Sequence, residues 1–427
     1  MEKTLTLLDL VFLAIESRVQ TGHVGGLAIF KLPAGTEAGF FQRAVESHRD
    51  WQRAHGSCAL KLSRKGVGLG WVEDERVDVA AHIQYLALPR PGNRRQLYTL
   101  VERLHAQHLD RQHPLWEATF IEGIEGGCGA IYIKVHHALM DGISAIRLLL
   151  GTFTLSSRVS PSRLFWQAEL PRRVSANGED QREGRGMVGT LVSTLEGVVT
   201  AMPTAATEAL RSALHALGLY GGPAVSTFMA PRTILNRQIT GRRHFATHDF
   251  SLSEVQTVAK TVGATVNDVV LMVCAGALRR YLLHHDALPK DPLIAWMPVS
   301  TRRAEDNRPS NQISMICVSL ATNVEDPIAR FRSIQASAAA AKQQVAAHSR
   351  EANEWLALLR GSFPILTDLL GVNEWVLPAT NLTISNVPGL GQHDGKASRF
   401  QQFRAKTVVA AGAGGRKVTQ SPKRGHP

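Results

Sequence analysis

Apolar residues recur with two different periods along the first third of the chain. Short apolar runs that end in Pro–Gly turns predict strands at residues 24–35 and 82–92. Apolar residues at helical spacing predict a helix over residues 96–109. Residues 114–123 and 129–137 then have the composition of two strands, with glycines between them, which is typical of a hairpin. The pattern therefore predicts an α/β unit that closes on a hairpin.

A second α/β pattern begins near residue 223. Ser251 with Glu254, and Thr265 with Asp268, have the spacing of two capping boxes, and each pair precedes an apolar helical segment. Two apolar strands and a long helix are expected after these helices. They lie at residues 293–303, 313–323 and 326–345.

A polar stretch separates the two units. Residues 156–187 have little to bury and are expected to form a linker, and amphipathic helices are expected soon after it. The fold class is therefore α/β (α+β), with two domains that each contain a mixed, mostly antiparallel sheet. The expected parts are an N-terminal domain at 1–155, a linker with crossover helices at 156–222, a C-terminal domain at 223–390 and a basic tail at 391–427.

Composition and charge narrow the function classes. The chain has 427 residues, of which 44% are hydrophobic and 20% charged, as in globular proteins. Of the net charge of +12, residues 391–427 contribute +7, from four Lys and four Arg against one Asp. The rest of the chain has no basic helix and no interleaved aromatic platform, so we expect no nucleic-acid partner.

Cysteine usage and hydropathy indicate a compartment. The four cysteines are scattered, without CxxC pairs, as is typical of thiols in a cytosolic protein. No apolar run reaches the roughly 18 residues that span a bilayer. The N-terminal segment carries Asp9 and Glu16 and lacks a small-residue cleavage site, unlike a signal peptide. We expect a cytoplasmic protein that is at most peripheral to a membrane or to lipid inclusions.

Two adjacent histidines are the strongest candidates for chemistry. Residues 134–142 read KVHHALMDG. Alternation along a strand places His136 and His137 on opposite faces, which argues against a shared metal, and no other ligands have metal-site spacing. A neutral imidazole at the end of a strand is suited to general-base work near neutral pH. The alternative is a core histidine, with Asp141 as an ordinary helix cap.

The motif HHxxxDG also resembles the signature of a superfamily that includes chloramphenicol acetyltransferase and peptide-synthetase condensation domains. The closer resemblance is to bacterial wax ester synthase/acyl-CoA:diacylglycerol acyltransferases. It covers further motifs in the family's order, between about residues 5 and 390. These are HVGGLAIF at 23–30, HPLWEATFIEG at 113–123, TVNDVVLMVCAGALRRYL at 265–282, MPVSTR at 297–302 and SNVPG at 385–389.

This resemblance implies a fold and a reaction. It implies two chloramphenicol-acetyltransferase-like domains with a tunnel between them. Acyl-CoA would be a co-substrate, a long-chain alcohol or diacylglycerol the acceptor, and no cofactor or metal would be needed. His137 would deprotonate the acceptor hydroxyl, while His136, Asp141 and Gly142 would support the motif. Asp141 would pair with Arg302 of MPVSTR, unless Arg302 is a surface residue.

The remaining motif residues each have two interpretations. Asn267 and Asp268 match an Asn-Asp motif that either starts a helix or contacts reactants. Trp116, with Pro114 and Leu115, belongs either to the core or to an acyl-chain lining. The last pair, Ser385 and Asn386, forms a polar turn or supplies hydrogen-bond donors to the cleft.

After SNVPG the chain departs from the family pattern. Residues 391–427 lack the family's apolar strands and are rich in basic residues, Gly and Pro, so we expect a disordered or frame-shifted tail. The main functional hypothesis is an acyl-CoA-dependent O-acyltransferase that makes wax esters or triacylglycerol. The alternatives are a non-catalytic lipid-binding member of the family, because of the tail, and a condensation-type acyltransferase, which would require carrier domains.

Overall fold

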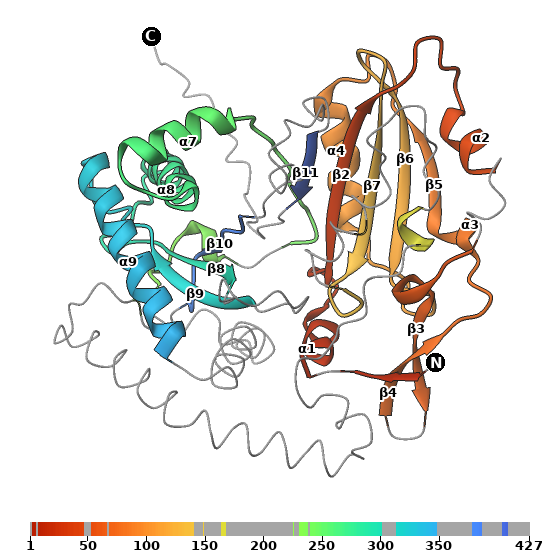
Figure 1. The fold of residues 1–427 in the computed structure, drawn as a ribbon, viewed down its shortest axis with the longest axis horizontal. Helices are drawn as coiled ribbons and strands as arrows, with labels where there is room; N and C mark the ends of the chain where they lie inside the picture. Colours follow the sequence, from red (N-terminus) through yellow and green to blue (C-terminus); the bar gives the residue numbers. More distant parts are fainter. Residues whose placement is uncertain are drawn as a thin grey trace, which may run out of the picture.

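The computed structural model places three β-sheets and their flanking helices (Figure 1). It describes residues 2–5, 7–46, 53–65, 68–140, 148, 164–167, 225, 230–237, 240–300, 313–347, 378–386 and 404–408.

The N-terminal half is built on a five-stranded sheet with the order β11-β2-β7-β6-β5. Its strands are β2 (His23–Lys31), β5 (Ile83–Ala87), β6 (Trp116–Ile124), β7 (Cys128–His136) and β11 (Arg404–Val408). Strands β6 and β7 form the expected hairpin, and only β5 pairs in parallel, with β6. The site described below lies at the end of the central strand, β7.

Each face of this sheet has its own apolar core. On one face, helix α4 (Arg94–Ala106) packs Leu97, Val101 and Leu104 against the strands. Asn93 and Gln96 form a capping box that starts α4 two residues before the sequence pattern predicted. The other face packs against α2 (Phe40–Glu46) and a set of aromatic side chains. The sheet is therefore buried on both sides, which holds β7 in a fixed position.

A smaller sheet lies at the N-terminus. It has the order β1-β4-β3, with strands β1 (Glu2–Thr4), β3 (Leu60–Lys65) and β4 (Gly68–Glu73). Helix α1 (Leu7–Ile15) packs with this sheet in a common core. The sequence pattern did not predict this unit, in which β1 has only three residues. The remaining short helices of the N-terminal half are η2 (Gly56–Ala59), α3 (Val79–His82) and η3 (Phe165–Gln167).

The C-terminal half contains the third sheet, with the order β10-β8-β9. Its strands are β8 (Ile294–Ser300), β9 (Ile313–Ser319) and β10 (Leu382–Thr383), and α8 and α9 pack on it around one apolar core. The helices lie where the pattern predicted them: α7 (Leu252–Thr261), α8 (Val266–His284) and α9 (Pro327–Ala347), preceded by the short turn η4 (Ile234–Asn236). Thr265 and Asp268 form the expected capping box at α8, whereas at α7 the cap consists of the Ser251 hydroxyl accepting a hydrogen bond from the Glu254 amide.

The predicted fold class is confirmed, because the five-stranded sheet and the β10-β8-β9 sheet each combine antiparallel pairing with one parallel pair. The expected tunnel stays a prediction. The expected domain boundaries at 155, 222 and 390, and the expected helices between 191 and 218, lie outside the described residues.

One part of the terminal segment differs from the expectation of disorder. Residues 404–408 form β11, which pairs antiparallel with β2 from Arg404 opposite Ile29 to Val408 opposite Gly25. Figure 1 shows β11 along the side of β2 that faces the C-terminal half. The run TVV has strand propensity, but a partner so distant in sequence leaves no local signal.

Within the described ranges, no individual helix has both the length and the apolar character needed to cross a bilayer. The consecutive helices α7 and α8 meet that criterion only when taken together, and the chain bends by 100° between them.

Candidate active site

Strand β7 separates its side chains as the sequence predicted. Ile133 and Val135 belong to the core on the α2 side of the sheet. Tyr132 packs in the core on the α4 side, and Lys134 on the same face donates a hydrogen bond to the Gln107 carbonyl, just past α4. The strand ends at His136, one residue earlier than expected, so that His137 begins the following turn.

His136 is completely buried, and its hydrogen bonds fix its tautomer. Its ring Nδ1 accepts a hydrogen bond from the Ala138 amide at 3.0 Å, so the neutral ring carries its proton on Nε2. Its own amide donates to the Leu115 carbonyl at 3.0 Å. Burial lowers the pKa of His136 to about 4; the Glu16 carboxylate opposes this shift, while Arg111 and His137 add to it. The burial and the lowered pKa of His136 favour a neutral ring with a structural role, and its support of the motif stays a prediction.

His137 has a different environment, because it is only half-buried. Its amide donates to the Gly22 carbonyl at 2.9 Å. Its ring is stacked on the ring of Phe12 in α1, with centroids 4.7 Å apart and planes 14° apart. Both the backbone and the ring of His137 are thus held in place, and part of its surface is accessible. These are the requirements for a general base that must meet a substrate.

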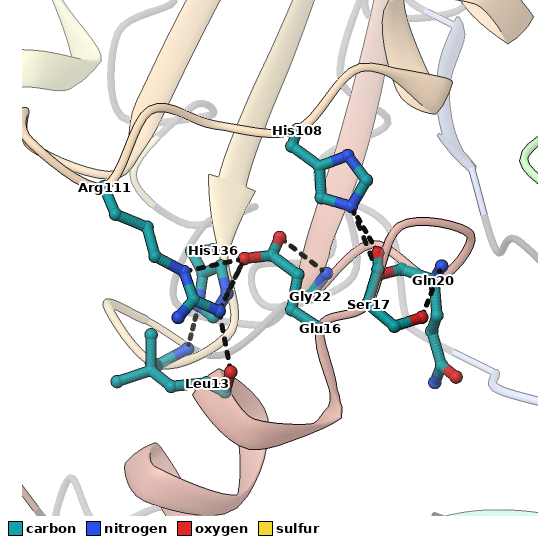
Figure 2. A network of polar contacts seen from close by, with 9 residues as sticks. Leu13, Glu16, Ser17, Gln20, Gly22, His108, Arg111 and His136 are labelled. Atoms are coloured by element: carbon teal, nitrogen blue, oxygen red, sulfur yellow. Dashed lines mark hydrogen bonds and ion pairs between the residues drawn. The ribbon is translucent and has the colours of Figure 1, made fainter. Parts of the chain in front are cut away.

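A charged pair, Glu16 and Arg111, lies beside His136 (Figure 2). Arg111 donates from Nε and Nη2 to Glu16 Oε2 at 3.0 and 2.8 Å. The same Nη2 donates to the Leu13 carbonyl in the last turn of α1 at 2.7 Å. Glu16 Oε2 lies 3.9 Å from His136 Nε2. Segments that are distant in the sequence therefore converge on the start of the HHxxxDG motif.

Further polar groups are buried on the same face of the sheet. His105 Nδ1 and the Tyr132 hydroxyl are 2.7 Å apart, and His23 Nε2 lies 3.0 Å from the His105 carbonyl. Lys134 Nζ lies 2.8 Å from Glu117 Oε2, and burial lowers the pKa of Lys134 while Glu117 opposes that shift. The polar contacts of His136 thus continue along β7 as a row of paired groups.

Metal binding finds no support in this geometry. Across the described parts of the chain, no group of three or more His, Cys, Asp or Glu side chains is arranged to hold a metal ion. The two motif histidines also differ in their contacts, since His136 faces Glu16 and His137 stacks on Phe12.

The PLW motif is close to the histidines and belongs to the core. The Leu115 carbonyl accepts the hydrogen bond from the His136 amide. Trp116 is fully buried, donates from its indole nitrogen to the Cys58 carbonyl at 2.8 Å and stacks on His82. Pro114 is also buried. These contacts favour the core interpretation of Trp116 over an acyl-chain lining.

Asp268 lies at the start of α8 and caps it. Asp268 Oδ2 accepts hydrogen bonds from the amide and hydroxyl of Thr265 at 3.0 and 2.8 Å, and the Asp268 amide donates to the Thr265 hydroxyl oxygen. This is the capping-box geometry that the spacing predicted, and it accounts for the carboxylate. Asn267 beside it is half-buried.

The other motif residues lie at or beyond the limits of what the structure describes. Ser385 is half-buried and Asn386 exposed, just after β10. Asp141, Gly142 and Arg302 lie outside the described residues, so the expected Asp141–Arg302 pair stays a prediction.

Sequence analysis missed four residues that surround the histidines: Phe12, Glu16, Gly22 and Arg111. Glu16 and Arg111 are 95 positions apart, and neither stands in a pattern that predicts their pairing. Only a weak indication in the sequence pointed to the importance of Gly22, namely its position just before the predicted strand. A Cβ at this position would lie 2.4 Å from His136 Nε2, so the close approach of the ring requires glycine.

Two family profiles together match most of the chain. The profile of the wax ester synthase/diacylglycerol acyltransferase catalytic domain matches residues 5–270, and that of the WS/DGAT C-terminal domain matches residues 310–393. The chain is 36% identical over 388 residues to the O-acyltransferase WSD of Acinetobacter baylyi, covering 90% of this chain and 81% of that protein. It is also 36% identical over 385 residues to a putative diacylglycerol O-acyltransferase of Mycobacterium tuberculosis, covering 90% of this chain and 83% of the relative.

Solved structures agree with these sequence relationships. The fold is similar to that of the wax ester synthase/diacylglycerol acyltransferase from Marinobacter aquaeolei, with a TM-score of 0.67, 32% identity and coverage of 91% of this chain and 82% of that one. The first condensation domain of the CDA synthetase has a TM-score of 0.52 at 15% identity, with coverage of 96% and 85%, which shows a shared fold alone. The chain therefore belongs to the wax ester synthase/diacylglycerol acyltransferase family and is an acyltransferase.

Proposed function

We propose that the chain transfers a fatty acyl group from acyl-CoA to the hydroxyl of a long-chain alcohol or diacylglycerol, with His137 as the general base. The observation that carries this proposal is the position of His137. It follows the central strand of a sheet that is buried on both faces, its ring is held by Phe12, and it retains an accessible side. The names of the family and of a relative include diacylglycerol as an acyl acceptor and wax ester as a product. Acyl-CoA and the long-chain alcohol come from the resemblance that the sequence motifs carry.

The reaction needs one base and no covalent enzyme intermediate. His137 takes the proton of the acceptor hydroxyl as the hydroxyl oxygen attacks the thioester carbon. The C–S bond then breaks, an ester forms, and the thiolate of coenzyme A leaves and receives a proton. General-base catalysis of this type contributes about 10²–10⁴ in rate.

The test uses purified full-length protein with labelled palmitoyl-CoA and either hexadecanol or dioleoylglycerol. His137→Gln should lower ester formation by about 10²-fold or more. His284→Gln is a matched control, because His284 is exposed at the end of α8. Ester formation by His137→Gln at the wild-type rate would refute the base assignment. Acyl-CoA binding without turnover by the wild type, with any acceptor, would favour the lipid-binding alternative.

We also propose that the protein meets its lipid substrates at a membrane or lipid-inclusion surface. Phe250 and Leu252, at the start of α7, are 62% and 53% exposed, and Val258 on α7 and Val262 just after it are exposed as well. Several exposed apolar residues along one helix are typical of such contacts.

Liposome flotation tests this surface. The double variant Phe250→Ser/Leu252→Ser should bind vesicles of mixed neutral and anionic lipid less well than the wild type. Ile328→Ser is the matched control, since Ile328 is similarly exposed but lies on α9. If the Ile328→Ser variant lost as much vesicle binding as the Phe250→Ser/Leu252→Ser variant, α7 would be excluded as the specific membrane contact.

A further inference from the structure

The Glu16 carboxylate lies next to the ring of His136 and to Gly22, the residue whose carbonyl holds the backbone of His137. Its Oε2 faces His136 Nε2 at 3.9 Å, and its Oε1 accepts a hydrogen bond from the Gly22 amide at 3.3 Å. The Gly22 carbonyl, at the other end of that residue, accepts the hydrogen bond from the His137 amide. Glu16 therefore contacts the ring of the first histidine and the residue that holds the backbone of the second (Figure 2).

Arg111 holds this carboxylate in place. Its two donors to Glu16 Oε2, together with its bond to the Leu13 carbonyl, fix the carboxylate against the end of α1. A cation at the C-terminal end of a helix is also favoured by the helix dipole. The side chain of Glu16 is 6% exposed and that of Arg111 is 46% exposed. The pair thus neutralises a buried carboxylate that would otherwise be costly beside the histidines.

The ring of His136 connects this pair to the turn that bears His137. The Ala138 amide donates to Nδ1, so the proton of the neutral ring is on Nε2, the nitrogen that lies 3.9 Å from Glu16 Oε2. Among the described residues, Nε2 has no partner within hydrogen-bond distance, which leaves the Glu16 carboxylate as the acceptor facing it. A shift of Glu16 would therefore change the orientation of His136, and with it the path of the chain from His136 to Ala138.

We infer that Glu16, held by Arg111, is a positioning residue for acyl transfer: it fixes the ring of His136 and the backbone of His137 so that the base meets the acceptor hydroxyl. This inference rests on the proposed role of His137 as the base. The pair also affects the electrostatics of the site. Glu16 and Arg111 together place no net charge beside the histidines, whereas either residue alone would place one there and shift their protonation equilibria.

The other charged or titratable groups around His136 are either neutral or paired, so Glu16 and Arg111 are the charges that the variants described next would change. Burial lowers the pKa of His23 to about 2, with His105, Lys134 and His136 adding to the shift, so His23 is neutral in the working range. Lys134 is paired with Glu117. The groups that face or adjoin His136 are Glu16 from the segment after α1, Arg111 from the segment after α4, His23 from β2, and Lys134 and His137 from its own segment.

Two single variants with opposite charge effects provide the test. Glu16→Gln leaves the Arg111 cation unpaired, and Arg111→Gln leaves the Glu16 carboxylate unpaired. Each should lower kcat about tenfold to a hundredfold with a smaller change in KM. The acidic limb of the pH profile of kcat/KM should move down in Glu16→Gln and up in Arg111→Gln, by about half a pH unit or more. The neutral double variant should return the limb toward its wild-type position.

Conservative and matched variants complete the design. Arg111→Lys keeps the charge but loses the two-pronged hydrogen bond, so the limb should stay in place while kcat recovers in part. Asp74→Asn removes a different charged pair, with Lys61, and should leave kcat and the limb unchanged. Lower kcat in both single variants with an unmoved limb would overturn the electrostatic part of the inference, and unchanged kcat would overturn the whole.

A readout without turnover separates this inference from the proposed function. In ¹⁵N-histidine NMR titrations of the full chain, with the His137 signal assigned through His137→Gln, the midpoint of His137 should move in opposite directions in the two single variants. If these shifts occur but His137→Gln retains activity, the positioning inference about the ring holds while the base assignment fails. Identical His137 titrations in all variants would contradict the inference even in an active enzyme.

Discussion

The ring of Phe12 is stacked on the ring of His137, with 4.7 Å between their centroids and 14° between their planes. Phe12 belongs to α1, whereas His137 follows β7, so this contact joins the first helix of the chain to the proposed base. Since α1 also supplies the Leu13 carbonyl that holds Arg111, its C-terminal half acts as the platform on which the histidine pair is oriented.

Phe12→Ala should therefore lower kcat by about tenfold, because the imidazole of His137 loses the surface that sets its plane. Phe12→Trp, which keeps a stacking face, should retain more of the activity. Steady-state kinetics with thermal melts of each variant measure this effect. A raised KM with unchanged kcat would instead mean that Phe12 contacts the substrate chain.

Gly22→Ala should destabilise the protein by about 1–3 kcal/mol and reduce activity, because the added Cβ would lie 2.4 Å from His136 Nε2. Urea denaturation and ester formation are the measurements. Gly241→Ala is the control, since nothing lies within 4 Å of a Cβ at that position. Equal stability of the two variants would show that His136 can move without cost.

Buried histidines should make the protein sensitive to acid. Burial, with smaller contributions from Arg243 and Lys134, lowers the pKa of His105 from 6.5 to about 4, and burial likewise lowers the pKa of His136 to about 4. The unfolded chain then binds more protons than the folded one between these values. The stability that these residues contribute is therefore present above pH 6.5 and is lost as the pH falls toward 4.

His105→Gln should reduce the slope of the free energy of unfolding against pH by up to about 1.4 kcal/mol per pH unit in this range. The reason is that the variant lacks one group that takes up a proton only in the unfolded state. Urea denaturation at several pH values between 7 and 4.5 measures the slope. The exposed His284→Gln should keep the wild-type slope. An unchanged slope in His105→Gln would mean that His105 takes up its proton in the folded state.

Asp268→Ala and Thr265→Ala should each destabilise the protein by about 1 kcal/mol, because they remove two halves of one capping box. Neither should change KM or kcat by more than a small factor if the carboxylate only starts α8. Chemical denaturation and kinetics of the two variants decide this. A large loss of kcat confined to Asp268→Ala would favour the contact with reactants that the family motif also allows.

Local sequence pattern predicted the features that depend on neighbouring residues. Alternation along β7 separated His136 from His137, and the three-residue spacing of Thr265 and Asp268 predicted their capping box. These features are set within one strand or one helical turn, where side-chain direction follows directly from the backbone period. The family resemblance, carried by motifs that span most of the chain, supplied the fold class and the reaction.

Features that depend on tertiary contact were not predictable in this way. Glu16 and Arg111 look like ordinary surface residues in the sequence, and only folding brings them together behind His136. Phe12 likewise reads as one apolar residue among many in its segment. In the small sheet, β3 and β4 pair as a local hairpin, but β1 has only three residues and pairs with β4 from Glu2 opposite Val72 to Thr4 opposite Gly70, a contact that leaves no local signal.

The pairing of β11 with β2 has a consequence for the synthesis of the chain. Arg404 pairs with Ile29, so one edge of β2 waits for its partner until most of the protein has been made. At a synthesis rate of about 5–20 residues per second, this interval lasts roughly 20–75 s. During that time β2 presents unpaired backbone groups of the kind that recruit foreign strands. Misassembly on the ribosome, more than instability of the finished fold, is then the hazard that this topology carries.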